Sequence, residues 1–317
     1  MTASLQGQHR SDIRWILWSL AGGLAVLFFV GGPGFHSPRS LSSVWDLGHI
    51  AAFSLWSFLL LQWKTVEKSS QSLQWRILLA FGLFFGGITE GIQSLIGGDA
   101  SCGDLLRDML GVLITLSWFT PASERLSSGA RRTVKSVSVS LVLIACIPLM
   151  VSVSDELLAR ARFPVLSDFE TPFEKDRWEG EARFSIDRAV AHQGKASLRV
   201  EMDTAQYSGV ALVYFPRDWK GYRYLFMEIL NPLPGRIDVT CRIHDGEHEK
   251  GEQRYDDRYN QVFHLLPGWN SLRIDLGDVL RAPVGRRMDL RNIRAVGVFS
   301  SRLPAPRTVF IDSVRLE

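Results

Sequence analysis

Cysteine is scarce in this 317-residue chain. The three cysteines, Cys102, Cys146 and Cys241, stand far apart and show no C-x-x-C spacing, which excludes a disulfide framework and a thiolate zinc site. Whether Cys102 pairs with Cys241 stays open at this stage. The net charge is only +3, so no basic field points to nucleic acid and no such partner is expected. The sequence also shows no internal repeat, no low-complexity segment and no nucleophile motif.

Charged residues are few in the first half and common in the second. Residues 1–160 contain 12 Lys/Arg and 10 Asp/Glu, about 14% of positions, whereas residues 161–317 contain 24 and 23, about 30%. The mean hydropathy of +0.05 therefore averages two unlike parts. The first part is too apolar for a soluble fold and the second is too polar for a bilayer, so we expect a multi-domain protein.

Five long apolar runs mark the first part. A bilayer core needs roughly 20 apolar residues per helix, and the runs predict an all-α transmembrane bundle of five helices within residues 1–155. The helices are expected at about 15–35, 44–63, 76–97, 104–120 and 135–154. The first run alone would also suit a signal peptide, but four further runs favour a retained helix. Residues 156–162 are expected as a connector to a second domain at 163–317.

Basic residues in the predicted loops set the orientation of the bundle. They concentrate in the N-terminal segment and in the loops after the second and fourth helices: Arg10, Arg14, Lys64, Lys68, Arg76, Arg125, Arg131, Arg132 and Lys135. By the positive-inside rule these segments are cytoplasmic. We therefore expect a multi-pass plasma-membrane protein with a cytoplasmic N-terminus and an extracytoplasmic second domain.

Ionisable and amide side chains interrupt three of the predicted helices at one level. A spacing of three or four residues puts both members of a pair on one helix face. The predicted orientation brings all the pairs to the outer side: Asp46 with His49, Glu90 with Gln93, and Asp104 with Asp108. Such groups face a bundle interior or a wet cavity. They predict either a hydrogen-bonded network that holds the helices together or a ligand site at the outer leaflet; catalysis or ion coupling is a third interpretation.

The same residues carry a resemblance to a known family. Asp46-Leu-Gly-His49, Thr89-Glu90-Gly-Ile-Gln93 and the segment from Ser101 through Asp104 and Asp108 to Gly111 resemble the D-x-x-H, E-x-x-Q and S-x-x-D-x-x-x-N-x-x-G motifs of VanZ-like membrane proteins. The resemblance covers roughly residues 15–120. It implies a cell-envelope role, tolerance to glycopeptide antibiotics such as teicoplanin, and an outer-leaflet lipid or wall-related ligand, with Ser101 as a further site residue.

The chain departs from this family pattern at two positions. Gly98 stands where the family usually has Arg, and Asp108 stands where it usually has Asn. The first difference removes the expected partner of an anionic ligand or of the carboxylates. The second adds a like charge to the group.

The second part changes to the period-two pattern of β-strands. Turn dipeptides such as Gln193-Gly194 and Pro267-Gly268 separate the runs. Strands are expected at 183–186, 197–202, 209–215, 224–230, 237–243, 261–265, 271–276, 295–300 and 308–316. Because no long helices intervene, the pattern predicts an all-β sandwich of two sheets.

This part is similar to the galactose-binding-like jelly rolls of carbohydrate-binding modules. The similarity rests on Asp168-Phe169-Glu170, on Gly194-Lys195-Ala-Ser197-Leu198-Arg-Val, and on Ile311-Asp312-Ser-Val-Arg-Leu. It implies a jelly-roll sandwich with a glycan or cell-wall polymer as partner. It also implies a structural calcium ion held by Glu170 and Asp312 together with carbonyl oxygens. The alternative is that both acids pair with nearby arginines.

A polar link between two predicted strands, at 244–259, is the most open candidate for a ligand loop. It supplies His244, Asp245 and Tyr255 as candidate binding residues, although a solvated hairpin explains the same composition. His244 and His248 would suit zinc only on a helix. The flanking strands argue against a helix there.

These observations favour a non-catalytic binding protein of the cell envelope. The bundle would contact a membrane lipid or wall-related ligand, and the sandwich would bind a glycan. The alternative is a membrane-embedded enzyme acting on a lipid-linked or cell-wall precursor, with Glu90, Asp104 or Asp108 as acid or base. A transporter is disfavoured because five helices without an inverted repeat are few for a transport path.

Overall fold

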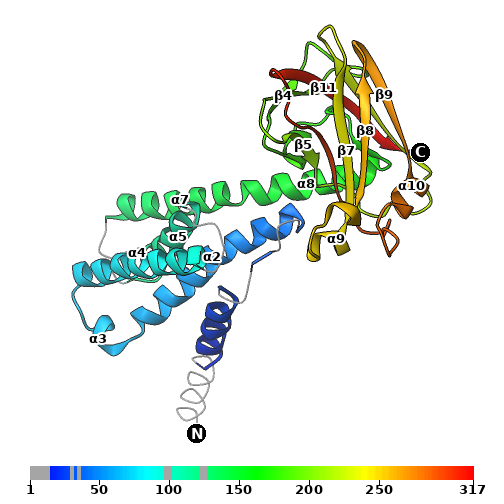
Figure 1. The fold of residues 1–317 in the computed structure, drawn as a ribbon. Coiled ribbons are helices and arrows are strands. Elements are labelled where there is room, and N and C mark those ends of the chain that lie inside the picture. The colour runs from blue at the N-terminus through cyan, green and yellow to red at the C-terminus, as the bar shows by residue number, and fades with distance from the viewer. Residues whose placement is uncertain (1–14, 29–31, 34–36, 96–101, 121–126) are drawn as a thin grey trace. The chain divides into compact units, whose positions relative to one another are not determined.

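The computed structural model describes residues 15–28, 32–33, 37–95, 102–120 and 127–317. The chain divides into two compact units, Met1–Ser152 and Val153–Glu317. Figure 1 shows helices in the first unit and strands in the second. The expected order of a helical half followed by an all-β half is therefore confirmed.

Helices make up the described part of the first unit. An apolar helix spans Trp15–Phe28. It is followed by α2 (Arg39–Leu61), α3 (Lys64–Glu67), α4 (Gln71–Leu95), α5 (Cys102–Trp118), α7 (Ser128–Ala145) and α8 (Ile147–Arg162). Ser127 caps α7, because its hydroxyl accepts a hydrogen bond from the backbone N–H of Ala130 at 3.2 Å. Residues 156–162, expected as a connector, are the last turns of α8.

Helices α2 and α5 pack closely at Gly111. A Cβ atom at this position would lie 2.6 Å from the carbonyl oxygen of Ile50. Two hydroxyls join the same backbones: Ser54 donates to the carbonyl of Gly111 at 3.0 Å, and Thr115 donates to the carbonyl of Ser54 at 2.9 Å. An apolar core surrounds this contact: Phe28, Ala52, Phe53, Leu61, Val66, Leu78, Val112 and Leu116.

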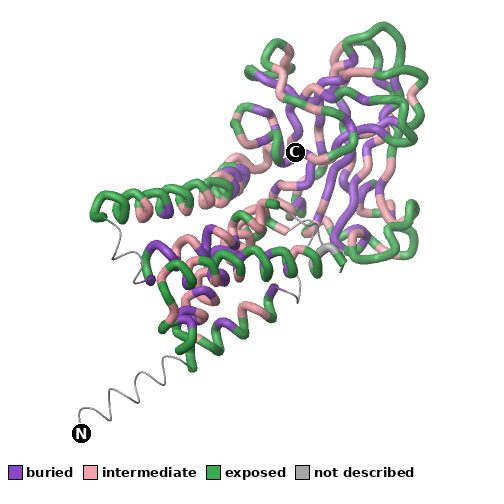
Figure 2. Tube along the Cα trace, turned by 90° about the vertical axis from the view of Figure 1, so that its left-hand side faces the viewer, coloured by how far each residue is buried: buried purple, intermediate pink, exposed green. Residues whose placement is uncertain are grey.

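Three helices among the described residues are long and apolar enough to cross a bilayer. They span Arg39–Leu61, Gln71–Ile92 and Ser128–Arg162. Large apolar side chains are exposed on the helices, including Leu83, Phe84, Leu143, Ile144 and Met150. Figure 2 shows Ser128–Arg162 exposed along most of its length. Such a surface is suited to lipid, whereas the expected number of five crossings stays a prediction.

The second unit is a sandwich of two antiparallel sheets. The six-stranded sheet has the order β3 (Arg183–Asp187), β4 (Ser197–Met202), β11 (Arg307–Leu316), β6 (Tyr224–Asn231) and β9 (Gly268–Asp275), with β1 (Val165–Ser167) paired to β11. The five-stranded sheet has the order β2 (Trp178–Glu179), β5 (Ser208–Leu212), β10 (Ile293–Ser300), β7 (Ile237–Asp245) and β8 (Tyr259–Leu265). The predicted two-sheet sandwich is confirmed.

Apolar side chains at alternate positions of the strands fill the space between the two sheets. In β7 the core positions are Ile237, Val239, Cys241 and Ile243. The residues between them therefore face outward, because successive side chains of a strand point to opposite faces. Cys102 is an exposed free thiol, whereas the free thiol of Cys241 is buried in the sandwich core. Burial raises the pKa of the Cys241 thiol to about 12.

Short helical segments connect several strands. They are η1 (Glu174–Arg177), α9 (Gly246–Lys250), η2 (Tyr255–Asp257) and α10 (Leu276–Arg281). The expectation that no helix forms around His248 is wrong, because α9 follows β7 directly. The Asp245 carboxylate caps α9 by accepting the backbone N–H of His248 at 3.0 Å.

Candidate functional site

The outer face of the five-stranded sheet carries a row of small and polar residues. Strand register aligns Ala211, Gly297, Arg242 and Asn260 across β5, β10, β7 and β8. The next row on the same face holds Gly209, Phe299, Thr240 and Val262. We call these two rows, together with the adjacent Tyr207, Tyr255 and Arg258, the arginine face.

Glycine at position 297 makes room for the side chain of Arg242. A Cβ atom at Gly297 would lie 3.5 Å from Nε and 3.7 Å from Nη2 of Arg242, so the guanidinium lies across β10. The same guanidinium lies 5.9 Å from the centroid of the Phe299 ring, which is within cation–π range. Tyr207 contacts that ring edge-on, with the centroids 5.8 Å apart. The aromatic pair therefore borders the Arg242 guanidinium.

A second guanidinium belongs to Arg258, which stands between η2 and β8. It sits 5.5 Å from the ring centroid of Tyr255. The side-chain amide of Asn260 donates to the carbonyl oxygen of Tyr255 at 3.0 Å, which ties η2 to β8. Tyr207 and Tyr255 are 59% and 70% exposed, so their rings are open to a ligand from solvent.

Several polar atoms of the arginine face are buried without a hydrogen-bond partner among the described residues. They are Nε of Arg242, Nε of Arg258 and Oδ1 of Asn260. Burial, and after it the positive charge of Arg258, lowers the pKa of the Arg242 guanidinium. Burial also lowers the pKa of Arg258, against the opposing effect of two nearby tyrosines. Unpartnered buried groups of this kind are costly, and each one calls for an explanation such as a ligand.

The predicted binding residues of the 244–259 link lie beside this face in different roles. Asp245 is fully buried and binds Arg286 through both oxygens, at 2.6 and 3.0 Å, so it stabilises the fold. His244 is also buried, with its ring centroid 4.9 Å from that of His248. Tyr255 is the exposed member of the three. Among the described residues no group of three His, Cys, Asp or Glu side chains is placed to hold a metal ion.

Sequence reasoning missed most of the arginine face. The signal for Arg242 was a charged residue alternating with apolar ones in β7, and the signal for Gly297 was a glycine inside an apolar strand. Neither signal shows that the two meet, because the register between β7 and β10 is a tertiary property. The aromatic residues Trp178, Trp219 and Tyr259 belong to the core rather than to this face.

Glu170 and Asp312, the predicted calcium ligands, both bind the loop at 192–196. Oε1 of Glu170 accepts the backbone N–H groups of residues 195 and 196 at 2.5 and 3.2 Å. Oδ2 of Asp312 accepts those of residues 192 and 193 at 2.7 and 3.0 Å. A calcium site surrounds its ion with oxygen atoms, whereas N–H donors contact these carboxylates. In this structure one oxygen of each carboxylate serves to hold the loop, and calcium stays a prediction.

In the helical unit the structure brings His49 and Asp108 together. Nδ1 of His49 lies 2.9 Å from Oδ1 of Asp108, and both residues are buried. The ring of Phe28 packs against His49, with centroids 4.4 Å apart. Oδ2 of Asp108 has no hydrogen-bond partner among the described residues and lies 3.0 Å from where a Cβ at Gly86 would stand. This pair links α2 to α5 beside α4.

Arg107 joins two further predicted residues, Asp46 and Asp104. Its Nη2 lies 3.1 Å from Oδ2 of Asp46, and its Nη1 pairs with Asp104. We expected the group to lack a cation because position 98 is glycine, and we missed Arg107 although it stands three residues after Asp104. Glu90 is half-buried on α4. The side chain of Gln93 and all of Ser101 lie outside the described residues.

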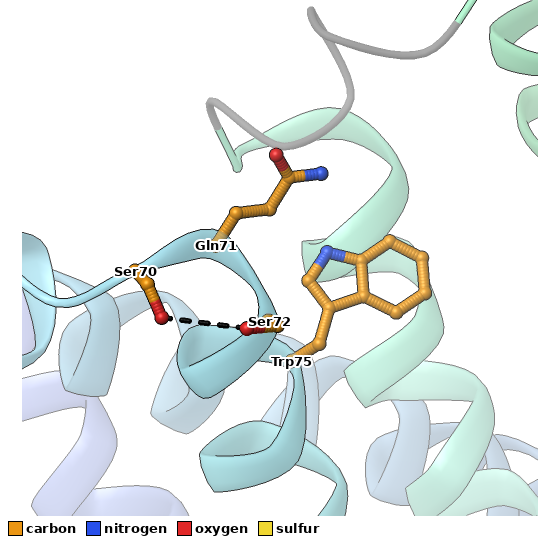
Figure 3. Close-up of a pocket in the computed structure, with 4 residues that line it drawn as sticks. All are labelled: Ser70, Gln71, Ser72 and Trp75. Atoms are coloured by element: carbon orange, nitrogen blue, oxygen red, sulfur yellow. Dashed lines mark hydrogen bonds between the residues drawn. The ribbon is translucent and has the colours of Figure 1, made fainter.

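A shallow pocket of about 590 Å³ opens at the first turn of α4 (Figure 3). It is lined by Ser70, Gln71, Ser72 and Trp75. An α-helix rises 1.5 Å per residue, so the pocket lies roughly 25 Å along α4 from Glu90. It contains none of the predicted site residues.

No protein-family model matches the chain, and no curated protein sequence matches it. The resemblance to VanZ-like proteins therefore stays a prediction.

Several solved structures resemble about half of the chain. An exo-β-agarase is 18% identical with a TM-score of 0.40; the match covers 48% of this chain and 24% of the agarase, so the chain spans about a quarter of that enzyme. The family 11 carbohydrate-binding module from Clostridium thermocellum, in complex with a β-1,3-1,4-mixed-linked tetrasaccharide, is 15% identical with a TM-score of 0.38. That match covers 48% of this chain and 93% of the module. At TM-scores below 0.5 these likenesses carry no functional conclusion, and the sandwich is assigned from its own strands.

Proposed function

We propose that this chain is a multi-pass plasma-membrane protein of the cell envelope that binds a glycan at the arginine face of an extracytoplasmic sandwich. The observation that carries the proposal is the arginine face itself. Exposed aromatic rings stand there beside buried polar atoms that lack partners. A binding site for a small polar ligand combines such ring surfaces with a few convergent polar groups.

The chemistry of the arginine face suits a sugar. The rings of Phe299 and Tyr207 offer apolar surface to the C–H groups of a pyranose. Oδ1 of Asn260 offers an acceptor for a hydroxyl, and the Arg242 guanidinium offers donors. Because Gly297 carries no side chain, the Arg242 guanidinium lies across β10 and presents its donors beside the Phe299 ring.

The helical half supports the membrane part of the proposal. Three of its helices are long and apolar enough to span a bilayer, and their exposed surfaces are rich in large apolar side chains. The residues proposed there for an outer-leaflet lipid or wall-related ligand are Asp46, His49, Glu90, Gln93, Ser101, Asp104 and Asp108. The bond between His49 and Asp108 also supports the plainer role of holding helices together. Tolerance to glycopeptide antibiotics is the phenotype that this role would produce.

The alternative of a membrane enzyme has weaker support. Asp104 is neutralised by Arg107, and Asp108 is buried against His49. A general acid or base has to reach its substrate within hydrogen-bond distance. Both aspartates already engage protein partners, so the non-catalytic interpretation is favoured.

A glycan array with the full chain in detergent tests the proposed function. We expect the wild type to bind at least one envelope glycan. Phe299→Ala and Tyr207→Ala should each weaken binding roughly 2- to 10-fold, the usual range for one aromatic contact. The matched control is Phe226→Ala, because Phe226 is likewise half-buried under an arginine, Arg315, but on the six-stranded sheet. Absence of binding to every glycan, or equal losses in Phe226→Ala, would refute the proposal.

A further inference from the structure

The arginine face also indicates which class of glycan it takes. Resting on the proposed function, we propose that the ligand is an anionic glycan whose carboxylate or phosphate groups bind the guanidinium groups of Arg242 and Arg258. The neutral parts of the sugar chain would lie against Phe299 and Tyr207.

The first observation is that neither guanidinium has an acidic partner among the described residues. Several other buried or partly buried arginines of the sandwich do have one. The pairs include Arg177 with Asp155, Arg199 with Glu201, Arg286 with Asp245, Arg294 with Glu249, and Arg315 with Glu317. Arg242 and Arg258 instead lie over the aromatic rings of Phe299 and Tyr255. Exposed arginines such as Arg223 and Arg273 also lack an acidic partner, but Arg242 and Arg258 are partly buried, and each has a buried Nε without a hydrogen-bond partner among the described residues.

The second observation is that the two positive charges act on each other. Arg258 disfavours the charged form of Arg242, and burial disfavours the charged form of both. Two partly buried like charges without a counter-ion destabilise the unliganded protein. An anion bound between them would remove the repulsion and replace the lost solvation with charge-assisted hydrogen bonds.

The acids closest to this face are already engaged or far away. Asp257 precedes Arg258 in the chain, but it binds Arg286 at 2.5 Å and lies 3.4 Å from His248. Glu179 pairs with Ala211 at the far edge of the row. At the usual spacing of about 4.8 Å between strands, the backbone of Glu179 lies roughly 10 Å from β10, across which the Arg242 guanidinium lies. The centre of the face therefore keeps its positive charge.

The geometry of the guanidinium group favours an oxyanion as the group that it binds. The planar fork of Arg matches carboxylate and phosphate groups with paired hydrogen bonds. The buried Oδ1 of Asn260, which lacks a partner among the described residues, offers an acceptor for a neighbouring hydroxyl. One acidic group and one hydroxyl on a ring that packs against Phe299 describe a uronic acid or a phosphorylated sugar.

Binding of the full chain in detergent to defined polymers tests this inference. The probes are polygalacturonate, its methyl ester, a phosphomannan, a neutral mixed-linkage β-glucan and polyglutamate. We expect polygalacturonate or phosphomannan to bind, and whichever binds identifies a carboxylate or a phosphate as the recognised group. The methyl ester and the neutral glucan should bind at least 10-fold more weakly, and the affinity for the anionic glycan should fall with rising salt.

Substitution of each arginine locates the binding. Arg242→Gln and Arg258→Gln should each weaken binding of the anionic glycan roughly 10- to 100-fold, as expected for loss of a charge-assisted hydrogen bond. Their melting temperatures should be unchanged or higher, because each substitution removes a repulsion. Arg258→Lys keeps the charge without the fork and should recover part of the affinity. Arg273→Gln is the control, because this exposed arginine lies over Tyr224 on the six-stranded sheet.

The outcomes separate this inference from the proposed function. Equal binding of the methyl ester and of polygalacturonate, with no effect of the arginine substitutions, would overturn the anionic ligand and leave glycan binding intact. Equal binding of polyglutamate would show that no sugar is recognised and would overturn both. Absence of binding to all five polymers would also overturn both.

Discussion

Asp155 and Arg177 form a buried ion pair at the start of the sandwich. Nε and Nη2 of Arg177 donate to Asp155 at 2.6 to 3.1 Å, and Nη1 donates to the carbonyl of Leu166 at 2.9 Å. Both charged residues are only 2% exposed. The pair ties the last turns of α8 to the segment before β2. The C-terminal part of α8 therefore belongs structurally to the sandwich.

Removing one partner of this pair should be strongly destabilising. Asp155→Ala leaves the Arg177 charge buried without its counter-ion, which typically costs about 3–5 kcal/mol. The control is Asp278→Ala, which breaks an exposed pair with Arg281 and should cost less than about 1 kcal/mol. Thermal unfolding of the full chain in detergent, followed by near-ultraviolet circular dichroism, measures both. Equal melting temperatures for the two variants would contradict the structural role of Asp155.

Asp245 should make the sandwich sensitive to acid. Burial alone would raise the pKa of this carboxyl, but hydrogen bonds from Arg286 and from the backbone N–H groups of Asp289 and His248 lower it below the ordinary value. Because the folded pKa is depressed, the stabilisation is complete above the unfolded pKa of about 3.9. It is lost as the pH falls through that value toward the lower folded pKa.

Urea unfolding between pH 7 and pH 3 checks this dependence. Asp245→Asn should be less stable than the wild type at pH 7 and should lose less stability below pH 4.5. Asp278→Asn, on an exposed carboxyl, should follow the wild-type curve. If the stability of Asp245→Asn fell with pH as steeply as that of the wild type, this carboxyl would not be the cause of the acid sensitivity.

The contact between α2 and α5 depends on a glycine. A Cβ at Gly111 would lie 2.6 Å from the backbone oxygen of Ile50 and 2.9 Å from the backbone nitrogen of Ser54. Backbone atoms cannot move aside as a flexible side chain does. The hydrogen bonds of Ser54 and Thr115 across this contact depend on the same short distance. The glycine thus determines how closely the two helices approach.

Gly111→Ala should separate α2 from α5 and lower stability by about 1–3 kcal/mol, the usual cost of overpacking. Gly87→Ala is the matched control on α4, because nothing lies within 4 Å of a Cβ there. Alanine favours a helix over glycine, so the control should be as stable as the wild type or more stable. Thermal aggregation of each variant in detergent measures the difference. A stable Gly111→Ala protein would contradict the close packing.

The longer elements could be predicted from the sequence and the shorter ones could not. Alternating apolar residues gave the strands from β3 to β11, since each has five or more residues. The two-residue β2 and the three-residue β1 are too short to show a period. The helices α9 and α10 depend on caps by Asp245 and Asp275 rather than on a repeating pattern. These short helices therefore depend on local hydrogen bonds and leave no periodic pattern of apolar residues in the sequence.

The candidate site was harder to predict than the fold. Arg242, Asn260 and Gly297 are far apart in the sequence and become neighbours only through strand register. The cluster of polar residues in the helical unit was easier to predict, because helical spacing places His49 and Asp108 on defined faces of their helices. Even there, the role of Arg107 depends on the packing of α2 against α5.

At the scale of the whole molecule, the proposed function requires the sandwich to face the outside. The basic loops predict this orientation. Alkaline phosphatase fused after Glu317 should therefore be active, because the enzyme works only outside the cytoplasm. The same enzyme fused after Lys68, in a predicted cytoplasmic loop, should be inactive. If only the fusion after Lys68 were active, the topology would be the reverse of the predicted one. An extracellular glycan would then be excluded as the ligand.

Hydrogen–deuterium exchange of the full chain, with and without polygalacturonate fragments, tests the central claim most directly because it locates the bound ligand. The arginine face predicts slower exchange at 240–244, 258–262 and 295–299, in the five-stranded sheet. The paired strands β6 and β9 of the six-stranded sheet, at 224–230 and 269–275, should be unchanged. Protection confined to 224–230 and 269–275 would contradict the assignment of the glycan to the arginine face.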